Sequence, residues 1–393
     1  MTKFNIDERI LRPVWFEIDL DALRHKYREA RRLGGEEVNI ICALKCNAYG
    51  FGYGEAAEEV LSLGAYGVAV ADLFEAVNLR QQGIKAPILL YANNLPSSSD
   101  TVIEFNLIPT VTSLDSARAY SKRAAFPLSV FVKIDVGLDR IGVLPELAVP
   151  FIEEVVSFKN IVLAGIYTHF HFSEDNDYMD WQFSRFKVIL EELEGKGIDI
   201  PIKMASATPS IVQFPHMCLN TVDPGRLIFG NPVVSSPRQH LDIRPVFRAL
   251  KTRLIDIKTI GPRSQFAQKR SFPVTRDMIL GVIPCGWGDG YSIKHGSIGM
   301  VLVRGKRIPI LGDVQFEHTR LDLTPVPEAK VGDEVVLIGR QGNEEISLAE
   351  VAEIRSTDLH DICQSVRHHV PRLYIKDGRP FKLKTPLGTT IFN

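Results

Sequence analysis

A single lysine follows a short apolar segment near the N-terminus and precedes a run rich in glycine and tyrosine. The apolar segment is 40–44 (IICAL), and Lys45 is followed by 46–54 (CNAYGFGYG). Removal from water favours the uncharged form of an amine, which is the nucleophile that bonds to a carbonyl carbon. The pattern therefore suits a lysine that binds a carbonyl cofactor, although a lysine at a strand end can also simply extend into solvent.

Small and hydroxyl residues later in the chain form a pattern typical of a phosphate site. Ser206 and Thr208 follow one apolar segment, and Gly225 and Gly230 follow the next. If these segments are the last two strands of a parallel barrel, backbone amides in the loops after them are well placed to bind phosphate. A reactive lysine combined with a phosphate site favours pyridoxal 5'-phosphate as the cofactor.

The elements that must position these residues alternate over the first two thirds of the chain. Eight β-branched segments begin near residues 39, 66, 87, 108, 128, 161, 202 and 221, with amphipathic segments between them. This alternation predicts a closed (β/α)8 barrel of the TIM type, whose active site lies at the carboxyl ends of the strands. A doubly wound open sheet is the alternative, but no Gly-x-Gly-x-x-Gly motif follows the first strand.

After about residue 244 the chain consists mostly of short strand-like segments separated by turn residues. One helix is expected within this region, because Ser347 and Glu350 have the spacing of a capping box. We therefore predict an α/β chain of two domains. A cofactor-binding (β/α)8 barrel spans 1–243, and a mostly β domain spans 244–393.

Composition disfavours several classes of partner. The 393 residues carry a net charge of −1 without a long basic or acidic run, so nucleic acid and anionic membranes are not expected partners. The first ten residues carry charges where a signal peptide would be apolar, and no apolar run reaches membrane-spanning length. The five cysteines lack paired metal-ligand spacing, so we expect no metal site, reduced thiols and a cytoplasmic location.

Several segments resemble, in the same order, the motifs of the alanine racemase family. They are 45–50 (KCNAYG), 133–142 (KIDVGLDRIG), 167–170 (YTHF), 289–291 (DGY), 301–310 (VLVRGKRIPI) and 370–374 (VPRLY). The first resembles the family's cofactor-lysine motif, and the second its Lys-x-Asp-Thr-Gly-Met-x-Arg-Leu-Gly motif. Because the resemblance covers nearly the whole chain, it implies a fold-type III pyridoxal-phosphate enzyme that acts on a small amino acid. It also implies a head-to-tail homodimer in which the partner's β domain completes each site.

The resemblance implies roles for the matching residues. Lys45 would bond to the cofactor and act as the base on one face of the substrate carbanion. Tyr49, Tyr374 and Thr208 would bind the phosphate, with Gly225 in the adjoining glycine turn.

Three further roles follow from the same resemblance. His169 would lie against the cofactor ring, and Arg140 would hold the ring oxygen and the substrate carboxylate. Lys133 matches a lysine that is carbamylated in some family members and orients that arginine. Judged without the resemblance, these residues are also consistent with a packed barrel histidine, a surface ion pair and an ordinary salt bridge.

One departure from the family pattern removes a proton acceptor. The family turn Gly-Tyr-Ala-Asp-Gly carries the second base, whereas 286–290 here is GWGDG and places Trp287 at the tyrosine position. An indole nitrogen donates a hydrogen bond but cannot accept a proton, and two-base racemisation needs an acceptor on each face. The candidate replacements are Tyr291, Asp289, Glu317, His318 and His171.

A second departure concerns the cofactor's ring nitrogen. The family segment Arg-Pro-Gly-Ile is here 223–226 (DPGR), so Asp223 replaces an arginine that keeps this nitrogen unprotonated. A carboxylate facing the nitrogen would hold a proton on it and make the ring a stronger electron sink. Alternatively, Asp223 is a turn residue before Pro224, or Arg226 compensates by swinging towards it.

A third departure lies at the expected substrate entrance. The family's Val-x-Met-Asp is here 314–317 (VQFE), and Ala207 replaces a common asparagine. Phe316 and Glu317 are bulkier than the usual pair, so we expect a larger or polar amino acid as substrate rather than alanine. Glu317 could equally be an exposed loop acid without a role.

The resulting hypothesis is a pyridoxal-phosphate-dependent amino-acid racemase or epimerase. Lys45 removes the α-proton, and Glu317 or Tyr291 serves the second face. The alternative is a lyase, aldolase or dehydratase that acts on one enantiomer. Trp287 would then shield the face of the substrate on which no proton is exchanged, and Asp223 would make the cofactor ring a stronger electron sink. A pyridoxal-phosphate-binding protein without turnover is a third reading.

Overall fold

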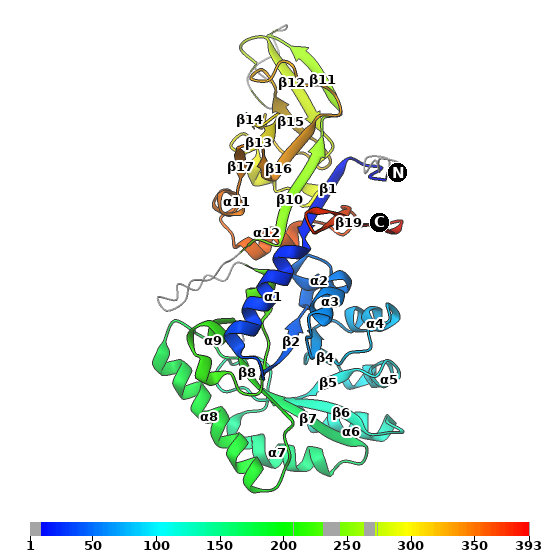
Figure 1. The fold of residues 1–393 in the computed structure, drawn as a ribbon, viewed down its shortest axis with the longest axis vertical. Helices are drawn as coiled ribbons and strands as arrows, with labels where there is room; N and C mark the ends of the chain where they lie inside the picture. The colour runs from blue at the N-terminus through cyan, green and yellow to red at the C-terminus, as the bar shows by residue number, and fades with distance from the viewer. Residues whose placement is uncertain (1–8, 207, 231–243, 263–271, 273, 393) are drawn as a thin grey trace. The chain divides into compact units, whose positions relative to one another are not determined.

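Apolar, β-branched segments form the strands of a closed parallel barrel in the computed structural model of the protein (Figure 1). Its strands are β2 (Asn39–Ala43), β3 (Gly67–Val70), β4 (Ile88–Leu90), β5 (Ile108–Val111), β6 (Leu128–Lys133), β7 (Ile161–Tyr167), β8 (Ile202–Ser206) and β9 (Thr221–Val222). Pairing of Asn39 with Thr221 closes the barrel between β2 and β9. The structure describes residues 9–206, 208–230, 244–262, 272 and 274–392. The predicted fold class is confirmed, and the strands begin within one residue of the predicted positions.

Helices follow the strands and cover the outside of the barrel (Figure 1). They are α1 (Leu20–Gly34), α3 (Tyr53–Ser62), α4 (Leu73–Gln81), α5 (Ser99–Glu104), α6 (Leu114–Arg123), α7 (Pro145–Ser157), α8 (Asn176–Gly195), α9 (Thr208–Gln213) and α10 (Gly225–Phe229). Asp72, Ser113 and Asp175 cap the first turns of α4, α6 and α8 by accepting hydrogen bonds from backbone N–H groups. These caps explain why the helices begin where they do.

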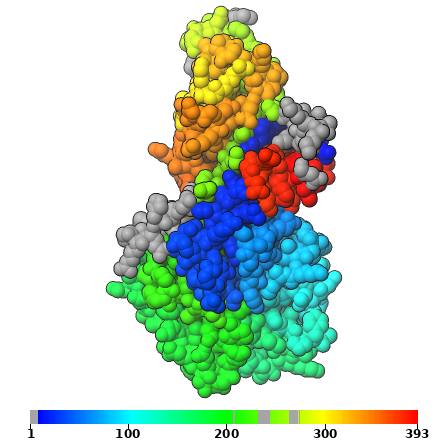
Figure 2. Space-filling model, viewed as in Figure 1, coloured from blue at the N-terminus to red at the C-terminus, as the bar shows by residue number. Residues whose placement is uncertain are grey.

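Side chains fill the barrel interior, so the described part of the barrel is a packed core. One buried layer consists of Ile41, Ala69, Leu89, Phe131, Tyr167, Ile202 and Met204. Gly165 in β7 permits this packing, because a Cβ atom there would lie 2.6 Å from the Phe131 ring. In the space-filling view the barrel residues, coloured from blue to green, present a closely packed outer surface (Figure 2).

Residue contacts divide the chain into Ala22–Arg244 and a second unit formed by Met1–Asp21 with Pro245–Asn393. The sequence-based division assigned the first strand, β1 (Val14–Asp19), to residues 1–243, whereas here it groups with the β-rich unit. The reason is its pairing: β1 runs antiparallel to β10 (Phe247–Arg253) and parallel to β18 (Arg372–Lys376).

Within its described residues, the β-rich unit contains two sheets, two short α-helices and two 3₁₀ turns. The larger sheet has the order β14-β13-β16-β10-β1-β18-β19-β20, with β17 paired to β16, and the smaller has the order β11-β12-β15. The remaining strands are β11 (Asp256–Ile260), β12 (Met278–Ile283), β13 (Met300–Val303), β14 (Lys306–Pro309), β15 (Thr319–Asp322), β16 (Glu334–Gln341), β17 (Glu344–Ile346), β19 (Arg379–Thr385) and β20 (Gly388–Ile391).

The expected helix in this region begins as the capping pattern indicates. The Ser347 hydroxyl accepts a hydrogen bond from the Glu350 N–H, 3.1 Å away, and α11 spans Leu348–Arg355. A second helix, α12 (Leu359–Ser365), was not foreseen, and it follows a left-handed residue, Ser356. In the described part of the chain no helix is both long and apolar enough to cross a bilayer.

Candidate active site

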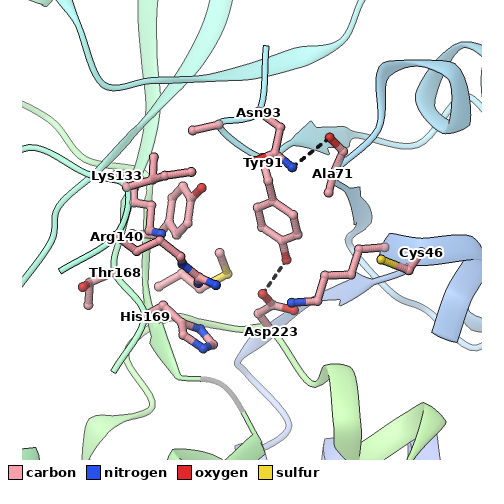
Figure 3. Close-up of a pocket in the computed structure, with 14 residues that line it drawn as sticks. Cys46, Ala71, Tyr91, Asn93, Lys133, Arg140, Thr168, His169 and Asp223 are labelled. Atoms are coloured by element: carbon pink, nitrogen blue, oxygen red, sulfur yellow. Dashed lines mark hydrogen bonds between the residues drawn. The ribbon is translucent and has the colours of Figure 1, made fainter. Parts of the chain in front are cut away.

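Two adjoining cavities open at the carboxyl ends of the barrel strands, each with a volume of about 360 Å³. Lys45, Arg140, His169 and Asp223 line both of them. Tyr91 and Lys133 border the first cavity (Figure 3). The barrel fold therefore brings together residues that lie up to 178 positions apart in the chain, from Lys45 to Asp223.

Lys45 lies at the start of a left-handed turn at the edge of the site. The turn forms α2 (Lys45–Tyr49), in which Cys46, Asn47, Ala48 and Tyr49 have φ angles of 54°, 56°, 49° and 56°. Left-handed backbone costs about 1–2 kcal/mol per residue with a side chain. Such strain persists only where surrounding contacts impose it, and it occurs preferentially at functional sites.

Two polar side chains impose this turn. Glu75 of α4 accepts a hydrogen bond from the Asn47 N–H at 2.5 Å, and the Asn47 side-chain oxygen accepts one from the Tyr53 N–H at 3.2 Å. Burial raises the pKa of Glu75 above its ordinary value. The sequence analysis did not identify Glu75, because it lies 28 residues from its partner and no local motif links the two.

The second cavity is lined at one end by groups suited to a phosphate. Tyr49, Thr208, Gly225 and Arg226 border it, and the Thr208 hydroxyl accepts a hydrogen bond from the Leu227 N–H at 2.9 Å. A Cβ atom on Gly225 would lie 2.3 Å from the Tyr49 hydroxyl oxygen. Only glycine therefore allows this close approach, and hydroxyl and guanidinium groups border one space.

Tyr374, the other predicted phosphate ligand, belongs to the β-rich unit. It lies in β18 and its side chain is fully buried there. Its role in phosphate binding stays a prediction. Ala207, expected at the substrate pocket, lies outside the described residues.

The loop that carries Arg140 is built around one carboxylate. Asp135 accepts hydrogen bonds from the backbone N–H groups of 137–140, at 2.7–3.2 Å. Burial alone would raise the pKa of Asp135, but these four hydrogen bonds bring it below its ordinary value. The Tyr178 hydroxyl donates to the Gly137 carbonyl at 2.7 Å and ties the loop to α8.

Positive charge dominates the lining of both cavities. Asp223 is the one carboxylate among the described lining residues, against the side chains of Lys45, Lys133, Arg140 and Arg226. Burial, reinforced by Arg140, lowers the pKa of Lys133 to about 8. An excess of cations favours an anionic ligand, and a lysine with this pKa is partly uncharged near pH 8 and able to react with carbon dioxide.

His169 lies in this cationic environment and is neutral at physiological pH. Burial and the nearby charges of the lysines and arginines lower its pKa to about 3. Its backbone segment is held by Gln182, a fully buried residue of α8 that the sequence analysis did not identify. The Gln182 side chain accepts from the His171 N–H at 2.9 Å and donates to the His171 carbonyl at 2.8 Å. This bidentate contact fixes the direction in which the segment leaves β7.

Asp223 follows β9 and projects into the site. Its Oδ2 atom accepts a hydrogen bond of 2.5 Å from the Tyr91 hydroxyl (Figure 3). Its Oδ1 atom is buried without a hydrogen-bond partner among the described residues. Burial raises the pKa of Asp223, while the Tyr91 hydrogen bond, the Lys45 charge and a backbone interaction with the Ala43 N–H oppose that rise.

These features fit pyridoxal phosphate as a cofactor. The donor-lined end of the second cavity suits its phosphate, and Lys45 lies where it can bond to the carbonyl carbon. The free Asp223 Oδ1 atom suits a nitrogen that carries a proton. In the described residues no cluster of three or more His, Cys, Asp or Glu side chains could hold a metal ion.

In the β-rich unit, Trp287 begins a short 3₁₀ turn, η5 (Trp287–Asp289). Asp289 is buried and accepts hydrogen bonds from the Arg12 guanidinium, from His369 Nε2 at 2.9 Å and from the Gly286 N–H at 2.9 Å. Burial alone would raise the pKa of Asp289, but these hydrogen bonds hold it below its ordinary value. Asp289 therefore anchors the turn, which argues against its use as a base.

The Trp287 ring packs edge to face against Phe316, with the ring centroids 4.3 Å apart. These side chains remain 44% and 55% exposed, and the neighbouring Glu317 and His318 are exposed as well. Tyr291, in contrast, is fully buried and stacks on His295 at 4.4 Å. Its hydroxyl lacks access to solvent, and burial raises its pKa, so the structure argues against Tyr291 as the second base.

Comparison with known proteins finds alanine racemases along almost the entire chain. Residues 18–232 match the family described as alanine racemase, N-terminal domain, and 247–374 match alanine racemase, C-terminal domain. The alanine racemase of Halothermothrix orenii is 35% identical over 374 residues, which cover 94% of this chain and 98% of that protein. That of Methanococcus maripaludis is 32% identical over 372 residues, covering 92% and 99%.

Solved structures show the same similarity. The alanine racemase of Clostridium difficile 630 superposes with a TM-score of 0.87 at 28% identity, covering 95% of this chain and 98% of that one. The structure of alanine racemase from Bacillus anthracis with bound L-Ala-P has a TM-score of 0.86 at 28% identity, covering 96% and 98%. Both cover the barrel and the β-rich unit together.

The close approach at Gly225 gives a test of the phosphate end of the site. We expect Gly225→Ala to weaken cofactor binding about tenfold or more, because the added Cβ atom must displace the Tyr49 hydroxyl. Titration of the apoenzyme with pyridoxal phosphate measures this affinity. Gly195→Ala is the matched control, since a Cβ atom there meets nothing within 4 Å. Equal affinities for the two variants would contradict the assignment.

Proposed function

The chain belongs to the alanine racemase family, and on that premise we propose that it racemises or epimerises an amino acid other than alanine. At the family level it is a pyridoxal-phosphate-dependent racemase-like isomerase. When bound, the cofactor supplies an electron sink for the charge left on the α-carbon after its proton is removed. The observation that carries the proposal is that Lys45, Arg140 and the phosphate-binding end face one connected site.

Each residue of the barrel has a distinct task in this proposal. Lys45 takes the α-proton on one face, and Arg140 binds the substrate carboxylate through its guanidinium. Tyr49, Thr208 and the backbone at Gly225 hold the phosphate. His169 packs against the ring as a neutral imidazole, a state that its low pKa supports. Asp223 accepts a hydrogen bond from the protonated ring nitrogen.

The substrate side chain and the second face are served by the β-rich unit of a second copy, in a head-to-tail homodimer. Trp287 and Phe316 support this assignment, because an exposed aromatic pair is typical of a surface that another chain covers. Glu317 and His318 lie beside the pair and are the proton acceptors for the second face. Phe316 and Glu317 narrow the entrance compared with the family's Met-Asp, which favours a substrate other than alanine.

A second function, a lyase, aldolase or dehydratase acting on one enantiomer, is favoured by two observations. Trp287 cannot accept a proton, and Asp223 with its free Oδ1 atom would strengthen the electron sink. Under this alternative the tryptophan shields a face on which no proton moves. The two functions differ in which enantiomers exchange their α-proton.

Proton exchange is therefore the decisive measurement. The enzyme is incubated in deuterium oxide with pyridoxal phosphate and panels of L- and D-amino acids, and the products are followed by NMR. We expect both enantiomers of one substrate to lose the α-proton and to interconvert, with alanine a slower substrate. Exchange or cleavage of one enantiomer alone would establish the lyase alternative. Exchange of none would indicate a binding protein without turnover, and alanine as the fastest substrate would contradict the proposed specificity.

The covalent role of Lys45 is tested by spectroscopy. We expect Lys45→Ala to lose the visible absorption of lysine-bound pyridoxal phosphate, because no amine remains at the carbonyl carbon. Lys187→Ala, on the exposed face of α8, is the control and should retain this absorption. A Lys45→Ala protein that still shows the lysine-bound spectrum would remove Lys45 from the mechanism.

Replacement of Trp287 tests whether another group already serves the second face. If Glu317 or His318 does so, we expect Trp287→Tyr to change the rate of racemisation less than about threefold. General acid–base catalysis contributes about 10²–10⁴-fold, so a gain of that size would mean that the natural enzyme lacks a second base. Trp287→Phe is the control, because it removes the indole without supplying a hydroxyl. A gain confined to Trp287→Tyr would refute the two-base proposal.

A further inference from the structure

One hydrogen bond crosses the mouth of the barrel between residues 132 positions apart. Tyr91 follows β4 and Asp223 follows β9, and β2 and β3 lie between these two strands in the closed barrel. The oxygen–oxygen distance of 2.5 Å is typical of a hydroxyl that donates to an ionised carboxylate. A hydroxyl that donates to a carboxylate stabilises its ionised form, so Tyr91 acts against the effect of burial on Asp223.

The two oxygens of this carboxylate have different environments. Oδ2 accepts from Tyr91, whereas Oδ1 is buried and makes no hydrogen bond of normal geometry to the residues that the structure describes, although the Ala43 N–H also interacts with the carboxylate. A buried carboxylate oxygen without a partner costs stability, and a ligand N–H group would remove that cost. Both cavities border Asp223, so a bound cofactor can present its ring nitrogen to Oδ1.

We propose that Tyr91 is a positioning residue that keeps Asp223 ionised and aimed at the ring nitrogen, so that the shared proton stays on the nitrogen. This inference rests on the proposed function, because it assumes that Asp223 faces the cofactor ring. It adds Tyr91 to the residues of the proposed site, although no local sequence motif indicates a role for this tyrosine.

The proton has two competing sites, the carboxylate and the ring nitrogen. A hydrogen bond from Tyr91 stabilises the charged carboxylate and so lowers the pKa of Asp223, against the effect of burial. Tyr91 itself remains a donor, because burial and the Asp223 charge raise its pKa far above the ordinary value. The titratable groups that interact with Asp223 are Tyr91, Lys45, Tyr49, Tyr167 and Cys42.

Loss of the Tyr91 hydroxyl changes this competition in a predictable direction. Without the donor, the pKa of Asp223 rises and the carboxylate becomes the better proton acceptor. The proton then moves from the ring nitrogen towards Asp223, and the ring becomes a weaker electron sink. Tyr91→Phe removes only the hydroxyl and keeps the ring, which lies 6.1 Å from the Tyr167 ring.

The test uses enzyme loaded with pyridoxal phosphate that carries ¹⁵N in its ring, because the ¹⁵N chemical shift separates protonated from unprotonated nitrogen. In wild type we expect the signal of a protonated nitrogen. In Tyr91→Phe the ratio of nitrogen-bound to Asp223-bound proton near neutral pH should fall about tenfold or more, because the carboxylate has become the better proton acceptor. Tyr167→Phe is the matched control: its hydroxyl bonds to Thr110 Oγ1 at 3.2 Å rather than to Asp223, so its ratio should match wild type.

The variant Asp223→Asn tests separately whether Asp223 contacts the ring nitrogen at all. Its result therefore distinguishes a wrong role for Tyr91 from a wrong position for Asp223. If Asp223→Asn deprotonates the nitrogen and Tyr91→Phe keeps the wild-type ratio, Tyr91 has no positioning role, while the ring contact stands. If neither variant alters the signal, Asp223 does not face the nitrogen and both assignments fall. The racemase assignment is judged independently, from proton exchange with both enantiomers.

A second variant keeps the inference testable if Tyr91→Phe folds poorly or binds little cofactor. Site-specific 3-fluorotyrosine at position 91 has a more acidic hydroxyl and is therefore a stronger donor. It should raise the ratio of nitrogen-bound to Asp223-bound proton, opposite to the effect of phenylalanine. A shift in the same direction as Tyr91→Phe, or none, would overturn the proposal.

Discussion

The site depends on the left-handed turn of 46–49. Four successive residues with side chains adopt positive φ angles, a conformation that costs about 1–2 kcal/mol for each. Contacts from Glu75 and Asn47 hold the turn, and the closed barrel fixes the strand that precedes it. Because of this turn, Lys45 and Tyr49 both line the cavity bordered by Gly225. Strain in the backbone is thus coupled directly to the geometry of cofactor binding.

Electrostatics in the site follow from the excess of cations. Lys133 and His169 both have lowered pKa values, because burial disfavours their charged forms and neighbouring cations add to the effect. An anionic cofactor and a substrate carboxylate would reduce this imbalance. Burial raises the pKa of Asp223, the one carboxylate among the described lining residues, and Tyr91 and Lys45 act against that rise. Recognition of anions is therefore a property of the whole lining and not of a single residue.

Local sequence patterns were sufficient to predict the barrel but not the contacts between its strands. The β-branched segments gave the strand positions, and Ser347 with Glu350 gave the start of α11. The pairing of β1 with β18 was not predictable, because it joins residues more than 350 positions apart. Tyr91 and Gln182 were missed for the same reason: each acts through a partner on a different element. The resemblance indicated roles for the residues that match the family motifs. It gave no information about the roles of residues such as Trp287 and Asp223, which differ from those motifs.

Two of the three departures from the family pattern, Asp223 and Trp287, become consistent when they are considered together. A proton held on the ring nitrogen makes the ring a stronger electron sink, which increases the acidity of the substrate's α-proton. A more acidic proton can be removed by a weaker base, because catalysis is efficient when the proton affinities of donor and acceptor approach each other. A carboxylate such as Glu317 or an imidazole such as His318 could then replace the phenol that Trp287 displaces. Under the proposed function, Asp223 on the barrel compensates for the tryptophan on the β-rich unit.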